Sequence, residues 1–275
     1  MSPATGTRSV AALGLSRTRI ELLQFRRETQ ALIFIFFFPV VMLVIFASVF
    51  NRSDFLESNG VGITGAQYYV TGMIATGVML SSFQALAIAI AVERDNGTLK
   101  LLHGTPMPAM AYFVGKVGQV VVTTAVQIAF LLAVASLAYG VTLPDSVEGW
   151  ARLVGLVVLG SAAGTSLGIA FASVPRSGRT AANVVTPVVL VLEFISGVYF
   201  PYSQLPSWMH AIASLFPLKW MAQGIRSVFL PPEMAAAEPG GSWQLTAGVV
   251  VLLVWLVVGL LVAGRTFRWV PNRRA

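Results

Sequence analysis

The sequence predicts an all-α membrane protein with six transmembrane helices, and three observations support this prediction. Charged residues make up only 11% of the 275 residues, whereas a soluble globular domain has about 25%. Six apolar stretches each hold about 20 or more residues, which is enough to cross a hydrocarbon core of about 30 Å. Basic residues gather at alternate ends of these stretches, as they do beside the cytoplasmic ends of membrane spans.

The predicted spans occupy most of the chain and leave no room for a separate soluble domain, which would need about 100 residues. Their approximate boundaries are 31–50, 68–92, 113–139, 153–174, 181–200 and 243–264. We therefore expect residues 1–275 to form a single membrane domain. Its remaining parts are a cytoplasmic tail and interfacial helix at 1–30, a cytoplasmic loop at 93–112 and an outer segment at 201–242.

The basic residues orient these spans with both the N- and C-termini in the cytoplasm, because bases near span ends stay on that side. The outer side then holds only Arg52, Arg152, Lys219 and Arg226. The inner side holds the other 14 of the 18 bases: Arg8, Arg17, Arg19, Arg26, Arg27, Arg94, Lys100, Lys116, Arg176, Arg179, Arg265, Arg268, Arg273 and Arg274. Since these bases flank spans, the net charge of +7 indicates membrane lipid as a partner and no nucleic acid.

Two features of composition argue against catalysis on this chain. There is no cysteine, so no thiolate metal site or cysteine nucleophile can form. The only two histidines, His103 and His210, are predicted on opposite sides of the membrane. We therefore expect neither a catalytic residue nor a metal site.

The segment before the first span predicts a short helix lying in the inner interface. Leu15, Leu22 and Phe25 fall at helical spacing among arginines that would face the lipid headgroups. The alternative is a basic flank of the first span. Within that span Phe34 and Phe38 share a face and would line a path for an apolar substrate, unless they simply face lipid.

Two further spans carry distinctive residues. Gly160, Gly164 and Gly168 recur every four residues, a pattern that lets another helix approach closely, and packing within this chain is the default. Glu193 is the only charge well inside a predicted span. Because such a charge costs about 2.5–3.5 kcal/mol at the bilayer centre, it should face the protein interior or a watered cavity. It would contact a cationic or hydroxylated substrate, or hydrogen-bond to another span.

The loop between the second and third spans is the most polar cytoplasmic insert. Asn96-Gly97 is a turn signal, and Thr98 is expected to cap a short helix after it. That helix would carry a hydrophobic ridge of Leu99, Leu101 and Leu102. The ridge would dock into a groove on another protein, or the segment would be a solvated loop.

In the outer segment at 201–242, Pro201, Pro206 and Pro217 break the helices into short pieces. Non-helical backbone at membrane depth survives only where protein or water satisfies it. We therefore expect short outer or re-entrant helices between the fifth and sixth spans, with an ordinary surface loop as the alternative.

Two separated motifs stand out, one after the second span and one after the fifth. The first reads Glu93-Arg94-x-x-Gly97-Thr98-Leu99-x-x-Leu102, followed by Thr105-Pro106 and later by Gly115-Lys116. The second reads Ser196-Gly197-Val198-Tyr199-Phe200-Pro201, then Leu205-Pro206-x-Trp208, Pro217-Leu218 and Arg226. Together they resemble the signature of ABC-2 type transporter permeases, the membrane subunits of daunorubicin-resistance and nodulation-type ABC exporters. The resemblance covers essentially the whole chain.

This resemblance implies roles for both motifs. The first would be the coupling helix that meets a separate ATP-binding subunit, through Glu93, Arg94, Gly97, Thr98, Leu99, Leu102, Thr105 and Pro106. The second would close the exit side, which adds Gly197, Phe200 and Pro201 to Glu193, Phe34 and Phe38 as candidates for the substrate path or gate.

The resemblance also implies partners and a function. No Gly-x-x-x-x-Gly-Lys-Ser/Thr motif occurs, so we expect no cofactor on this chain and ATP with Mg²⁺ on a partner ATPase subunit. A second permease subunit, identical or not, would complete an exporter of drugs, antibiotics or lipids in a prokaryotic plasma (inner) membrane. The alternatives are a polysaccharide or glycolipid exporter, and an ATP-independent transporter, which would need inverted repeats or several intramembrane charges.

Overall fold

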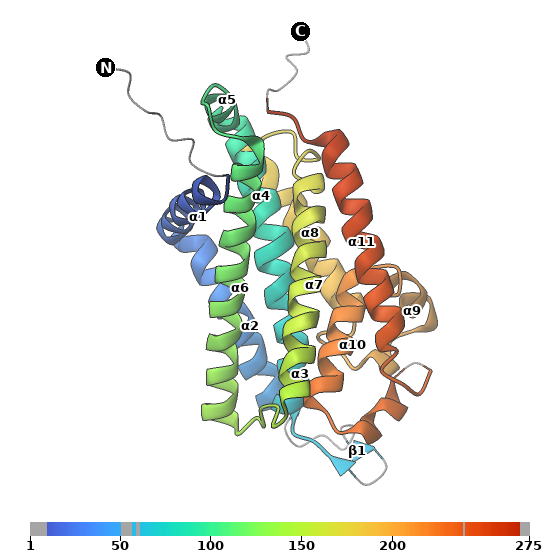
Figure 1. Cartoon of the computed structure of the whole chain (residues 1–275). Coiled ribbons are helices and arrows are strands. Elements are labelled where there is room, and N and C mark those ends of the chain that lie inside the picture. Colours follow the sequence, from blue (N-terminus) through green and yellow to red (C-terminus); the bar gives the residue numbers. More distant parts are fainter. Residues whose placement is uncertain (1–9, 51–56, 59–60, 239, 270–275) are drawn as a thin grey trace, which may run out of the picture.

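The computed structural model describes residues 10–50, 57–58, 61–238 and 240–269, and these residues form a helical bundle (Figure 1). Their only β-structure is a two-stranded hairpin, β1 (Glu57–Ser58) and β2 (Val61–Gly62). Six helices in this part of the chain are long and apolar enough to cross a membrane: α2 (Thr29–Phe50), the continuous helix Gly65–Asp95, α6 (Ala109–Tyr139), α7 (Val147–Phe171), α8 (Gly178–Ile195) and α11 (Leu245–Thr266). The predicted fold class and number of spans are confirmed.

The predicted span boundaries differ from the observed helices where local backbone chemistry intervenes. The fourth span begins earlier than predicted because Ser146 caps α7 by accepting a hydrogen bond from the Gly149 N–H, at 3.0 Å. The fifth span ends at Ile195 rather than residue 200, because Gly197 adopts a positive φ of 73° that a continuing helix cannot contain.

The two ends of the bundle differ in what they carry. The short helix α5 (Thr98–His103), the start of α1 (Val10–Arg27) and the end of α11 share one end, which we call the inner end (Figure 1). The β-hairpin lies at the opposite, outer end. That the inner end faces the cytoplasm stays a prediction, and Arg8, Arg52, Arg273 and Arg274, which contributed to it, lie outside the described residues.

The second span forms the centre of the bundle and contains a π-helical turn. It consists of α3 (Gly65–Met79), η2 (Leu80–Gln84) and α4 (Ala85–Asp95). The Ser81 and Ser82 hydroxyls donate hydrogen bonds to the Gly77 and Val78 carbonyls, and such back-bonding locally distorts a helix. The central helix of the bundle is therefore irregular between Leu80 and Gln84.

The three glycines of α7 pack against other helices of this chain, as the sequence analysis expected by default. Gly160 lies against Met221, and Gly164 lies against Ser82. At Gly168 an added Cβ would stand 2.9 Å from the Phe83 carbonyl oxygen, so no larger residue fits without movement. Gly164 and Gly168 let α7 pack directly on the π-helical turn, and Gly160 lets it pack on α10.

The predicted N-terminal helix is present as α1, but its bases do not all face outward. The buried face of α1 packs on α6 and consists of Gly14, Arg17, Glu21 and Phe25. The prediction that the arginines face headgroups is wrong for Arg17, which is only 7% exposed because acidic side chains surround it. Leu15 is exposed on α1.

The outer segment is a series of short helices. They are η3 (Tyr202–Gln204), α9 (Ser207–Ala213), α10 (Pro217–Phe229) and η4 (Pro232–Ala237). Proline starts α10, where its missing N–H is not needed. Because α10 is almost wholly buried among α3, α7 and α11, this part is not an ordinary surface loop.

Candidate functional site

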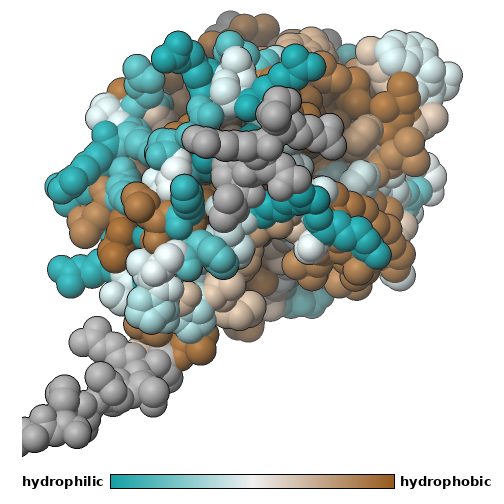
Figure 2. Space-filling view, turned by 90° about the horizontal axis from the view of Figure 1, so that it is seen from above, coloured by the Kyte–Doolittle hydropathy of each residue, from teal (hydrophilic) through white to brown (hydrophobic). Residues whose placement is uncertain are grey.

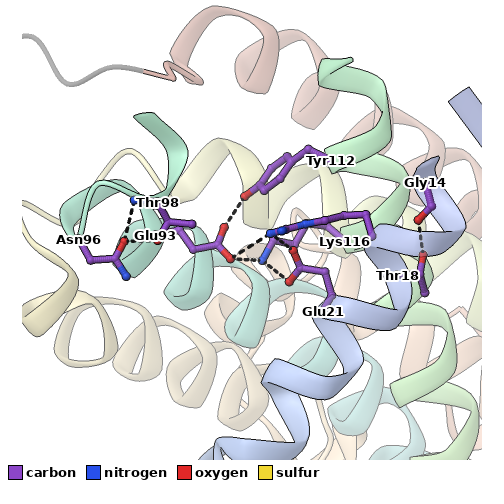
Figure 3. A network of polar contacts seen from close by, with 9 residues as sticks. Gly14, Thr18, Glu21, Glu93, Asn96, Thr98, Tyr112 and Lys116 are labelled. Atoms are coloured by element: carbon purple, nitrogen blue, oxygen red, sulfur yellow. Dashed lines mark hydrogen bonds and ion pairs between the residues drawn. The ribbon is translucent and has the colours of Figure 1, made fainter. Parts of the chain in front are cut away.

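A buried ion network joins three helices at the inner end (Figure 3). The Lys116 Nζ of α6 lies 2.7 Å from Glu21 Oε2 of α1 and 2.7 Å from Glu93 Oε1 of α4. Arg17 forms an ion pair with Glu21 at 2.5 Å, and the Tyr112 hydroxyl donates to Glu93 Oε2 at 2.7 Å. We call these five residues the inner network; their helices are held together by shared charges.

The charges of the inner network balance, with two bases facing two carboxylates. Lys116 lies in the first turns of α6 and is 1% exposed, so a second charge is buried within a spanning helix besides Glu193. Removing one member of a buried pair leaves an uncompensated charge, which costs about 3–5 kcal/mol. The network therefore favours one relative placement of α1, α4 and α6.

The end of α4 also binds the turn between α7 and α8. Arg94 donates one hydrogen bond to the Ala172 carbonyl at 2.9 Å and another to the Pro175 carbonyl. The Asp95 carboxylate accepts a hydrogen bond from the Gly178 N–H at 3.0 Å. Thus Glu93 and Arg94, predicted to contact a partner, are both engaged inside the chain.

Helix α5 begins as the turn signal predicts, although a different residue caps it. Gly97 takes a φ of 81°, and the Asn96 side chain accepts hydrogen bonds from the Thr98 N–H and hydroxyl. Thr98 is the first helical residue, so the prediction that it caps the helix is wrong. The predicted leucine ridge is also wrong, because Leu99 is 1% exposed while Leu101 is 76% exposed.

The exposed part of α5 forms a surface at the tip of the inner end (Figures 1 and 2). Lys100, Leu101 and His103 are exposed there, Leu102 is half-buried, and Thr105 and Pro106 continue the exposed surface. We call Lys100–Pro106 the α5 tip. Figure 2, which views the inner end, shows hydrophilic side chains over much of it with hydrophobic ones between them.

Aromatic side chains brace α5 from the C-terminal side. The His103 ring stacks on Trp269 with ring centroids 5.9 Å apart. Trp269 also contacts Tyr112 of the inner network at 5.4 Å and Phe267 at 5.2 Å. The residues after α11 therefore connect the α5 tip with the start of α6.

A cavity of about 610 Å³ lies beside the inner network, between α1, α2, α4, α6 and α8. Glu21, Glu93 and Lys116 line its polar part, and Phe34 and Ile35 line an apolar part. The Phe34 and Phe38 rings stack at 4.9 Å, so they do share a face, but only Phe34 lines the cavity. The cavity thus offers charged and apolar walls to one molecule.

Glu28, between α1 and α2, adds a further carboxyl to this cavity. Desolvation raises the pKa of the Glu28 carboxyl, and the positive charge of Lys116 partly offsets this rise. Within the residues that the structure describes, no three His, Asp or Glu side chains gather closely enough to hold a metal ion.

Glu193 lies near the outer end of α8, and its side chain is completely buried. The Tyr199 hydroxyl donates to Glu193 Oε2 at 2.6 Å, and Thr76 of α3 lies beside the same carboxyl group. Burial and the neighbouring Glu193 raise the pKa of Tyr199 far above its usual value, so this tyrosine stays a donor. Among the described residues, Glu193 Oε1 has no hydrogen-bond partner.

The chain matches one family of membrane proteins. A family model described as "ABC-2 type transporter" matches residues 16–230, well over half of the sequence. The chain belongs to the ABC-2 type transporter family. A search of curated proteins found no match. Members of the family are membrane components of ABC transporters and act together with an ATP-binding subunit. The family prediction is therefore confirmed, and the match includes most of α1, the inner network and α10.

In this ABC-2 family member the outer segment holds a second buried ion cluster. Arg226 of α10 pairs with Glu238 and donates to the Gly197 carbonyl at 2.9 Å. Its guanidinium lies 5.5 Å from the Tyr68 ring centroid. We call Tyr68, Gly197, Arg226 and Glu238 the outer cluster. It brings together Gly197 and Arg226, which both belong to the second motif of the sequence.

The gate candidates do not form one site in this ABC-2 family member. Phe34 and Phe38 lie in the inner half of α2, whereas Glu193 and Gly197 lie near the outer segment. Phe200 is exposed and Pro201 is buried. From α2, Phe46 instead of Phe34 or Phe38 reaches the residues that follow α8, with its ring centroid 5.6 Å from that of Tyr199.

Sequence reasoning missed both ion clusters. A usable signal existed for the inner network, because Arg17 and Glu21, and likewise Tyr112 and Lys116, stand four residues apart on their helices and so share a face. No comparable spacing connects Glu238 with Arg226.

Proposed function

We propose that this chain is the permease subunit of an ATP-driven exporter of the daunorubicin-resistance or nodulation type. It forms the translocation path for a hydrophobic or amphipathic substrate, such as a drug, an antibiotic or a lipid. The observation that carries the proposal is the exposed α5 tip, attached through Glu93, Arg94 and Asp95 to four other helices. The host membrane is the plasma (inner) membrane of a prokaryote.

The α5 tip receives the ATP-binding subunit, which carries ATP and Mg²⁺. Lys100, Leu101 and His103 offer that partner a basic and apolar surface. Displacement of the tip is passed to the α7–α8 turn by Arg94 and Asp95, and to α1 and α6 by Glu93. Because these contacts link whole helices, ATP-driven closure moves the spans as connected rigid bodies.

The cavity beside the inner network receives the cargo. Its apolar wall at Phe34 suits a hydrocarbon or aromatic body, and its charged wall suits a polar end. A second permease subunit supplies the opposite wall of the path and the second ATPase contact. Movement of α1, α4 and α6 changes this cavity, because all three line it.

The proposal is tested by purification with and without the ATPase subunit. Alone, the chain should neither bind nor hydrolyse ATP; with the ATPase, it should form a complex that hydrolyses ATP. The variant Leu101→Asp should lose this complex, whereas Leu143→Asp, at another exposed leucine, should keep it. ATP hydrolysis by the chain alone, or equal complex formation by both variants, would refute the proposal.

A further inference from the structure

A second cavity, of about 890 Å³, lies on the side of the bundle between α6, α7 and α11. Figure 1 shows α7 with α6 on one side and α11 on the other. Its walls are mainly apolar and include Val121, Val158 and Leu260, each of which is more than half exposed. None of its lining residues belongs to the cavity assigned to the cargo. We call it the lateral groove.

The lateral groove extends along the length of a membrane span. Trp150 lines it near the outer start of α7, and Ile169 lines it near the inner end of the same helix. At about 1.5 Å per residue, these positions are separated by roughly 28 Å, close to the thickness of a hydrocarbon core. The medium that faces the groove in a membrane is therefore the acyl chains of lipid.

The two mouths of the groove carry different charge. At the inner mouth, Gly264 and Phe267 line the groove, and the exposed Arg265 and Arg268 stand next to them in sequence. Neither arginine forms a salt bridge within the described residues. At the outer mouth the nearby Arg152 is already paired with Glu148, at 2.6 Å.

The difference in charge between the two mouths favours lipid of the inner leaflet and an anionic headgroup. Arg265 donates one hydrogen bond to the Leu261 carbonyl at 3.4 Å, which leaves its other N–H groups and those of Arg268 for phosphate oxygens. Such bonds are charge-assisted and strong. Each base near an anionic lipid surface contributes about 1 kcal/mol. A headgroup with a net negative charge is therefore favoured at the inner mouth, while its acyl chain follows the apolar wall of α7.

We propose that the lateral groove binds an anionic phospholipid of the inner leaflet, with its phosphate at Arg265 and Arg268 and an acyl chain along α7. This bound lipid is a component of the fold and not the exported cargo. Its binding needs no ATP, so the inference stands or falls separately from the proposed export function.

Native mass spectrometry of the purified full chain, titrated with phosphatidylglycerol or phosphatidylcholine, tests the proposal. The wild type should bind phosphatidylglycerol about tenfold or more tightly than phosphatidylcholine, since two bases contribute. Arg265→Gln/Arg268→Gln should lose that preference but keep the weaker binding. Arg176→Gln/Arg179→Gln removes two exposed bases near the turn between α7 and α8, whose sequence neighbours line neither cavity, and should keep the preference.

Occupation of the groove itself is tested with Val158→Cys, which creates the only thiol because the sequence has no cysteine. Attachment of a bulky maleimide after folding should fill the groove and displace both lipids. Retention of phosphatidylglycerol by the labelled protein would overturn the proposal, as would an equal loss of preference in the two arginine variants. Disulfide-linked dimers of Val158→Cys in membranes would also overturn it, because they would show that a second copy covers the groove.

Discussion

The inner and outer ends of the bundle both contain buried ion pairs, but they join different parts of the chain. The inner network connects Glu21, Glu93 and Lys116, which come from three helices far apart in sequence. The outer cluster pairs Arg226 with Glu238, only twelve residues later. The inner network therefore fixes helices relative to one another, whereas the outer cluster mainly closes one local segment on α3 and the end of α8.

Charged residues of the inner network line a cavity, whereas Arg226 of the outer cluster does not. Glu21, Glu93 and Lys116 line the inner cavity, so a change in the cavity reaches the charges directly. Arg226 is 1% exposed and lies in neither of the two cavities described above. We infer that the inner network can rearrange during a transport cycle and that the outer cluster stays closed. The four predictions below test this difference.

The largest effect is expected from Lys116→Met. This substitution leaves Glu21 and Glu93 without their shared cation, and it should lower the free energy of unfolding by about 3–5 kcal/mol. Thermal unfolding in detergent measures the change. Lys116→Arg keeps the charge and serves as the matched control, with a much smaller loss. A Lys116→Met protein as stable as the wild type would mean that the inner network does not hold the helices.

Arg226→Met should destabilise the outer end by about 3 kcal/mol, because Glu238 then stays buried without a counter-charge. Its functional consequence should differ from that of Lys116→Met. The folded fraction should still bind the ATPase subunit, since the α5 tip is at the other end of the bundle. Co-purification measured per folded molecule decides the point, and loss of binding would contradict the independence of the two ends.

Hydropathy alone predicted the fold, because a span is specified by the summed transfer free energy of about 20 residues and tolerates local errors. The α5 turn was predictable for a similar reason, since Asn96-Gly97 encodes it locally. The orientation of α5 about its own axis was not predictable in this way. Whether Leu99 or Leu101 is buried depends on which side of the helix meets the bundle, and no local pattern in six residues specifies that.

The inner network was missed for a different reason. Counting charges by membrane side treats Arg17 and Lys116 as headgroup contacts. Their burial depends on the close approach of α1 to α6, which Gly115 and Gly118 permit by facing Arg17 and Thr18 without side chains. Pairing is thus a property of helix packing, and a single sequence does not reveal which helices pack.

Glu193→Gln should have a smaller effect, about 1–2 kcal/mol, because the amide still accepts a hydrogen bond from Tyr199 but loses its charge. Tyr199→Phe makes the opposite change, because it removes the hydrogen bond from Tyr199 but keeps the Glu193 carboxyl, and it is the matched control. Thermal unfolding is measured together with export of one cationic and one neutral cargo. Loss of cationic export alone would make Glu193 a substrate contact; unchanged stability and export would exclude both this role and a structural one.

The smallest effect is expected at the α5 cap. Asn96→Ala removes the acceptor for the Thr98 N–H, which should cost about 1 kcal/mol and act only locally. Hydrogen exchange should become faster in Thr98–His103, while the global unfolding midpoint stays within error, because opening of α5 does not require the bundle to open. Asn96→Asp keeps an acceptor and should keep slow exchange. If exchange in α5 does not change in Asn96→Ala, the tip is held by Leu99 and the His103–Trp269 stack instead of its cap. Force from the ATPase would then reach α6 through that aromatic contact as well as through the inner network.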